Sequence, residues 1–199
     1  MLDRLSVSTS LATIIAVLAK LAILYKDANE TWYIDNINQK VLYLILISVF
    51  LIFFRGKMMH DDSAFFKDIE SDNFKKDPHS KVRIKSGLMI GYISWLFWAP
   101  AIYFLQNPPA LSGWLLASIG LSTIWLIIDI MTRKSGEDKE AKKRPVWVIA
   151  NILYAVPLIL LMTQTFSPAV LATVLVLILL VDWLISDTLA TVFTEKTEG

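Results

Sequence analysis

The clearest indication of the fold class is the stretch from Pro168 to Ala190, which reads PAVLATVLVLILLVDWLISDTLA. It is apolar over most of its length, and a helix of about 20 apolar residues is long enough to cross the hydrocarbon core of a bilayer. Only 19% of the 199 residues are charged, whereas soluble domains carry roughly a quarter. The stretch therefore predicts a transmembrane helix.

Apolar segments of the same kind recur along the rest of the chain. The predicted spans are residues 5–25, 38–57, 87–106, 111–131, 145–164 and 168–190. The second span is the weakest, because its uninterrupted run from Val41 to Phe54 also suits a buried or interfacial helix. The sequence predicts an all-α, polytopic membrane helix bundle with six transmembrane helices in a single domain.

Lysine and arginine are concentrated in residues 55–86 and 132–144, whereas the connections near Asn107 and Thr165 hold none. Cytoplasmic loops of membrane proteins are enriched in these residues. We therefore expect both basic connections and both termini in the cytoplasm, in a multi-pass protein of the inner or plasma membrane. Anionic lipid is the expected contact of the basic clusters, and nucleic acid is not expected, because acidic residues are interspersed in both connections.

Two segments resemble each other in sequence. Residues 125–129 read WLIID and residues 183–187 read WLISD. One interpretation is a repeat of three helical hairpins in the same orientation, and the other is a chance likeness between apolar helices with interfacial tryptophan. Asp129 and Asp187 are interpreted as carboxylates at helix ends.

Polar side chains within the predicted spans fall at a common depth. Asp182 lies about 21 Å along the last span, and Asn151 lies at the same level in the fifth. The candidate intramembrane cluster consists of Ser94, Thr123, Asn151, Tyr154 and Asp182. Its functional interpretation is a cation or proton site or a gate, and its structural interpretation is hydrogen bonding that fixes the packing. Lys20 lies at another depth, so we do not expect it to pair with Asp182.

The connection 58–86 is expected to form a cytoplasmic loop with a short amphipathic helix, capped near Asp61. Contacts with a partner or the membrane surface are expected at Phe65, Phe66, Ile69, Lys81, Arg83, Lys85, Lys142, Lys143 and Arg144. Three adjacent residues, 60–62 (His-Asp-Asp), rarely make a closed metal site, so neither a metal nor a cofactor is expected. The absence of cysteine excludes thiolate ligands and cysteine nucleophiles.

Three functions compete at this point. The preferred hypothesis is a non-enzymatic anchor, sensor or assembly subunit that presents its basic loops to a protein partner or joins a homo-oligomer. This hypothesis is preferred because the charged residues of the chain lie mainly in those loops. The alternative is a small channel or transporter with the polar cluster around Asp182. A membrane enzyme acting on lipid comes third, because residues 60–62 are the only candidate site and lack a nucleophile partner or a phosphate-binding loop.

Overall fold

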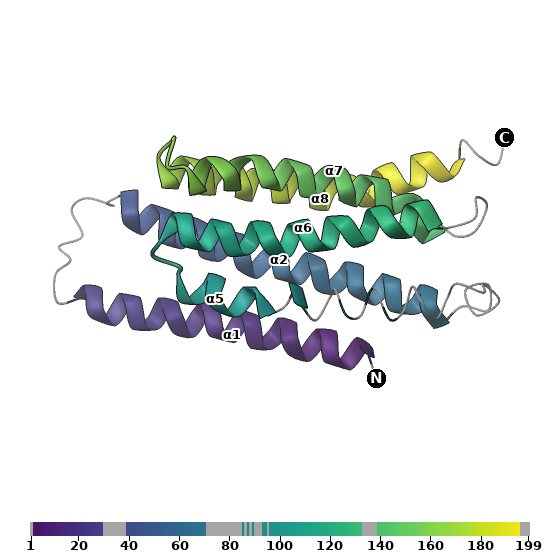
Figure 1. Ribbon diagram of the computed structural model, residues 1–199. Coiled ribbons are helices and arrows are strands. Elements are labelled where there is room, and N and C mark those ends of the chain that lie inside the picture. Colours follow the sequence, from purple (N-terminus) through teal and green to yellow (C-terminus); the bar gives the residue numbers. More distant parts are fainter. Residues whose placement is uncertain are drawn as a thin grey trace.

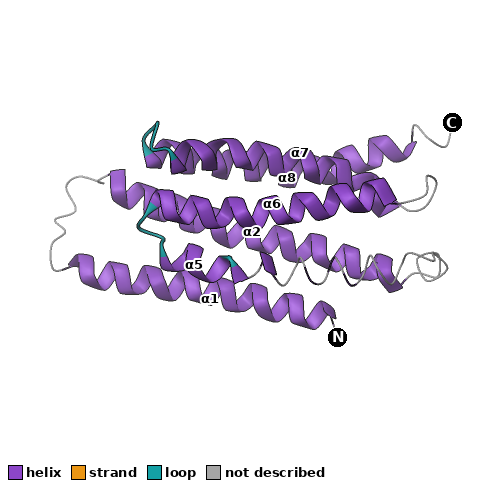
Figure 2. Ribbon diagram, in the orientation of Figure 1, coloured by secondary structure: helices purple, strands orange, loops and turns teal. Residues whose placement is uncertain are grey.

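A computed structural model describes residues 2–29, 39–70, 85, 87, 89, 93–94, 96–132 and 139–195. The described residues are helical apart from short turns, and no strand occurs among them (Figure 2). The helices are α1 (Leu2–Asn29), α2 (Gln39–Glu70), α5 (Trp98–Tyr103), α6 (Pro108–Thr132), α7 (Lys139–Met162) and α8 (Pro168–Glu195). The prediction of an all-α chain is therefore confirmed over this part of the chain.

The helices lie side by side in one elongated bundle (Figure 1). α2 packs against α8 and α1, α7 lies between α6 and α8, and α5 contacts α6 and α1. At one end of the bundle α2 and α6 finish and α7 begins, and we call this the basic end because the basic connections follow or precede these helices (Figure 1). At the opposite end α2, α6 and α8 begin (Figure 1).

Four helices contain a stretch that is long and apolar enough to cross a membrane. These stretches are Gln39–Met58, Pro108–Met131, Arg144–Met162 and Pro168–Ile185. The segment that looked weakest in the sequence is among them, because the spanning stretch of α2 adds two residues before its apolar run and about a turn after it. α1 contains a shorter apolar stretch, Ser10–Leu24. The predicted span 87–106 lies partly outside the described residues, and α5 is its continuous helical part.

The surface carries many large apolar side chains and the interior contains charged ones, which differs from a water-soluble bundle. Large apolar side chains stand on the surface, and Leu96, Leu184 and Met131 are each more than two-thirds exposed. In contrast, Asp129 and Arg144 are each only 1% exposed. Water favours the opposite arrangement, because exposed apolar area and buried charge both cost free energy there. The exposed apolar side chains therefore favour contact with an apolar solvent over contact with water.

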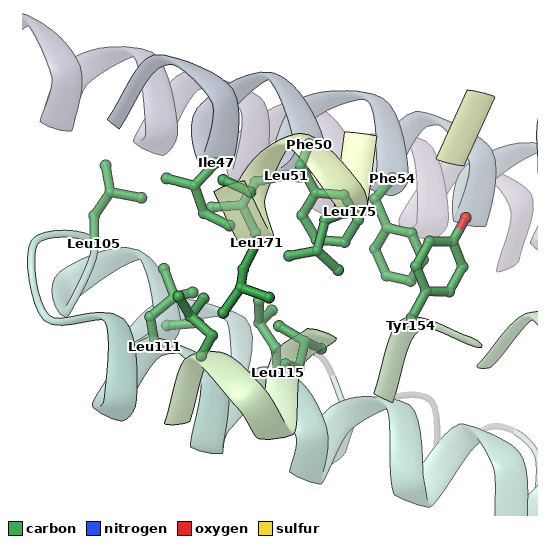
Figure 3. Close-up of a cluster of buried hydrophobic side chains, with 14 of the residues drawn as sticks. Ile47, Phe50, Leu51, Phe54, Leu105, Leu111, Leu115, Tyr154, Leu171 and Leu175 are labelled. Atoms are coloured by element: carbon green, nitrogen blue, oxygen red, sulfur yellow. The ribbon is translucent and has the colours of Figure 1, made fainter. Parts of the chain in front are cut away.

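The core is a continuous cluster of aliphatic and aromatic side chains along the centre of the bundle (Figure 3). Ile47, Leu51 and Phe54 of α2 face Leu115 of α6, with residues of α8 between them (Figure 3). Tyr154 of α7 stands beside Phe54 at the edge of this cluster, with ring centroids 4.9 Å apart (Figure 3). The apolar core therefore ends at a tyrosine hydroxyl on the side of the basic end.

Local sequence signals account for the turns at the opposite end. Asn107 caps α6, since its side-chain oxygen accepts a hydrogen bond from the Ala110 amide at 3.2 Å, and proline occupies the first helical position. α7 ends in a Schellman arrangement, in which the amide of Thr165 donates to the Leu160 carbonyl and Gln164 has a φ of 55°. These caps fix the two tight turns that the sequence predicts.

The expected short amphipathic helix within residues 58–86 is corrected by the structure. α2 continues without a break from the apolar stretch to Glu70, so residues 58–70 extend the same helix. No proline or glycine lies between Lys57 and Glu70 to end the helix, and the lone Gly56 costs only about 1 kcal/mol in a helix. The side chains of Phe65, Phe66 and Ile69 lie outside the described part.

Candidate functional site: buried charge pairs near the basic end

Lys57 of α2 and Asp182 of α8 form an ion pair inside the bundle. The ammonium nitrogen lies 3.4 Å from Asp182 Oδ2, and the two side chains are 9% and 6% exposed. Both helices begin at the opposite end, so Lys57 lies about 27 Å and Asp182 about 21 Å along the bundle. A helical side chain leans back towards the helix N-terminus, which brings the lysine to the aspartate level.

Tyr154 of α7 completes this group. Its hydroxyl donates a hydrogen bond to the same oxygen, Asp182 Oδ2, at 2.8 Å. The tyrosine is 1% exposed, and its ring packs against Phe54. One carboxylate oxygen thus contacts an ammonium from α2 and a phenol from α7. We call Lys57, Tyr154 and Asp182 the lysine site.

A second ion pair joins α6 to α7. The Arg144 guanidinium contacts Asp129 Oδ2, and each side chain is 1% exposed. Trp125 lies one turn before Asp129 on α6, and its ring centroid is 5.5 Å from the guanidinium carbon. The arginine is therefore held between a carboxylate and an aromatic face. We call Trp125, Asp129 and Arg144 the arginine site.

Gly87 adjoins the arginine site. A Cβ atom added at this position would lie 2.9 Å from Cζ2 and Nε1 of Trp125, a distance that real Cβ atoms essentially never show. Glycine therefore allows the indole of Trp125 to approach the backbone of the preceding segment closely. The same indole packs against Arg144, so Gly87 supports the position of the arginine.

Arg55 is the third buried basic residue of this region, at 1% exposure. Its guanidinium carbon lies 5.9 Å from the Trp98 ring centroid of α5, and Nη1 contacts Met58 Sδ at 3.8 Å. The Trp98 ring in turn stacks on Phe54. The sequence places Arg55 and Lys57 in a basic connection, whereas the structure buries both because α2 carries them along its packed face.

The members of the predicted polar cluster enter three separate contacts. Asp182 accepts a hydrogen bond from Tyr154, as described above. Asn151 Nδ2 donates to Thr123 Oγ1 at 3.0 Å, which links α7 to α6. Ser94 shares a hydrogen bond with Ser118 of α6, a residue that the sequence analysis did not include. The contacts of these residues also involve Lys57 and Ser118, which the sequence did not indicate as partners.

Arg144 requires a correction. The sequence predicts that it contacts a partner or the membrane surface, but the structure buries it against Asp129. The reason is that α7 begins at Lys139, within the predicted basic loop, so Arg144 already lies on a helix face that packs against α6. Asp129, interpreted as a helix-end carboxylate, is buried for the same reason.

The other predicted surface contacts are only partly described. Lys85 is exposed. Lys81 and Arg83 lie outside the described residues, as do the side chains of residues 60–62, Lys142 and Lys143. Lys20 lies over the ring of Tyr103 in α5, with the ammonium 5.5 Å from the ring centroid. Within the described residues, no group of three or more acidic or histidine side chains is arranged to hold a metal ion.

A signal for the missed partners was present in the sequence. Asp129 and Arg144 flank a short connection between adjacent antiparallel helices, and Lys57 is the last residue of the predicted span 38–57. Opposite charges at matched levels of neighbouring helices are candidates for pairing.

Comparison of the chain with protein-family models, with curated proteins and with solved structures found no match.

Proposed function

We propose that the chain is a multi-pass protein of the inner or plasma membrane, with six spans and both termini in the cytoplasm. The apolar surface and the four helices of spanning length support this proposal. The basic connections leave from one end of the bundle, and the turns at the other end carry no lysine or arginine. The positive-inside rule then assigns the basic end to the cytoplasm.

Single-cysteine labelling tests this orientation cleanly, because the chain has no cysteine of its own. In intact cells a membrane-impermeant maleimide is expected to label Gln106→Cys and Thr165→Cys, which lie in the exposed turns of the opposite end. Glu70→Cys and Asp138→Cys are expected to react only after the cells are opened. Labelling of the last two variants in intact cells would contradict the proposed orientation.

We further propose that the protein is a non-enzymatic scaffold that presents its basic cytoplasmic segments to a protein partner. The observation that carries this proposal is the position of the two ion pairs. Asp129 and Arg144 flank one basic connection, and Lys57 precedes the other. The connection between α6 and α7 therefore starts from helix ends that are tied to each other by buried charges, whereas α2 continues from its buried Lys57 to Glu70 before the other segment begins. A segment with a fixed base loses less freedom when it binds a partner.

Replacement of residues 60–78 by a glycine–serine linker of equal length tests the scaffold. The purified wild-type complex is expected to exceed the mass of the 22.5 kDa chain by the mass of a bound protein, whereas the linker variant loses that protein. Light scattering and mass spectrometry of the detergent-solubilised sample measure both. A Gln106→Ser, Thr165→Ser variant, altered at the opposite end, serves as the control. Equal masses and equal co-purifying proteins in all three samples would contradict the scaffold, whereas a homo-oligomer would keep its multiple of the chain mass.

A second candidate function, a small channel or transporter, is favoured by the lysine site. Ionisable side chains within a membrane are costly and commonly mark ion or proton pathways. Asp182 is placed between an ammonium and a phenol from two different helices. Movement of α2 relative to α8 would therefore change the distance between the Lys57 ammonium and the Asp182 carboxylate.

A further inference from the structure

The two buried ion pairs differ in the chemistry of their cations. The arginine site pairs Asp129 with a guanidinium, which stays charged under all ordinary conditions and can donate two parallel hydrogen bonds to a carboxylate. The lysine site pairs Asp182 with a primary ammonium on a flexible stem. The first pair is chemically permanent, whereas the second can change partner or protonation state.

Position adds to this difference. Asp182 lies about 21 Å along α8, which leaves about 9 Å to the basic end of a bilayer core about 30 Å thick. Lys57 is nearer that end by about 6 Å along its helix. A lysine ammonium at this distance from the interface can extend along its stem to the headgroups. The Lys57 ammonium can therefore move to the headgroups if Asp182 no longer attracts it.

The charged and titratable groups around Asp182 are contributed by both helices that pack against α8. Among the described residues, α2 contributes Lys57 and α7 contributes Tyr154. Arg55, also on α2, is directed at Trp98 of α5. A proton added to Asp182 removes the negative charge that faces the Lys57 ammonium at 3.4 Å. The ammonium then loses this attraction and can withdraw to the interface.

We propose that the lysine site binds and releases one proton, taken up from the aqueous phase at the basic end by Asp182. Protonation breaks the attraction to Lys57, and the return of the ammonium expels the proton. The Tyr154 hydroxyl remains beside the carboxyl group in both states and keeps it aligned. Because the pair joins α2 to α8, proton binding loosens the helix that leads into the first basic connection. This inference deepens the second candidate function, since it names the proton as the species bound.

Infrared difference spectroscopy of the protein in lipid, recorded as the pH is lowered, tests the inference. The wild type is expected to develop a carboxylic-acid band that is one carboxyl group per chain larger than in the Lys57→Met, Asp182→Leu double variant. That double variant removes both charges together, so the bundle keeps an apolar contact and folds. The matched control is the Arg144→Met, Asp129→Leu double variant, which is expected to retain the full band. An equal band in the wild type and the first double variant would overturn the inference.

Lys57→Arg separates a proton site from an ion pair that only holds the helices together. At a pH at which wild-type Asp182 is partly protonated, the carboxylic-acid band of the variant is expected to be severalfold smaller, because the guanidinium stays charged and can donate two parallel hydrogen bonds to the carboxylate. A solely structural pair tolerates the exchange, and an unchanged band would overturn the proposed release of lysine. Proton flux into liposomes, read with an enclosed pH-sensitive dye, tests transport separately. If the Asp182 carboxylic-acid band is observed without proton flux into the liposomes, the proton site is supported and the transporter function is rejected.

Discussion

Replacement of Arg144 by methionine is expected to destabilise the bundle by about 3–5 kcal/mol, because it leaves the buried Asp129 carboxylate without its guanidinium. Both side chains are 1% exposed, so water cannot replace the lost partner. Methionine fills the space of the arginine stem but lacks the guanidinium that lies over the Trp125 ring. Unfolding in mixed detergent micelles, followed by circular dichroism, measures the loss.

The decisive control removes the carboxylate as well. The Arg144→Met, Asp129→Leu double variant is expected to recover most of the lost stability, since paired buried charges can often be exchanged for apolar residues at little net cost. The difference between the single and double variants isolates the cost of an uncompensated charge. If the single variant is as stable as the wild type, the ion pair contributes nothing to the packing of α6 on α7.

Phe54→Ala is expected to cost about 3–5 kcal/mol, the range found when a large aromatic side chain is removed from a packed core. Phe54 is 5% exposed and joins three helices through aromatic contacts. Its ring stacks on Phe50 with centroids 5.2 Å apart, on Trp98 at 6.0 Å, and meets Tyr154 edge-on at 4.9 Å. Lipid or detergent cannot fill the resulting cavity without opening the bundle.

The neighbouring residue is a matched control for this substitution. Phe53 precedes Phe54 on α2, but its side chain is 53% exposed and meets only the edge of Trp183 among the described aromatic rings. Phe53→Ala is expected to cost less than about 1 kcal/mol, because it leaves no enclosed cavity. The same micelle unfolding measurement compares the two variants. Equal losses would show that Phe53 and Phe54 contribute equally to the core and would contradict the assignment of Phe54 to it.

The lysine site shows which of its members could be predicted from the sequence and which could not. Asp182 was identified from its depth alone, since a carboxylate well inside an apolar segment is conspicuous. Its partner was not identified, because Lys57 lies at the end of the predicted span 38–57, where lysine commonly reaches the interface. The pairing depends on the face that α2 turns towards α8, and that rotation follows from the packing of Phe50 and Phe54 in the core.

Local sequence is enough to predict the helical class, the tight turns at the opposite end and the concentration of basic residues at the other. These properties depend on sums of hydropathy and on capping residues within a few positions of each other, so they can be recognised along the chain. The packed bundle was needed to establish that α2 continues to Glu70, that Arg144 is buried, and which cation pairs with each aspartate. Those outcomes depend on how neighbouring helices are rotated and aligned, and the packing of side chains from several distant segments sets both.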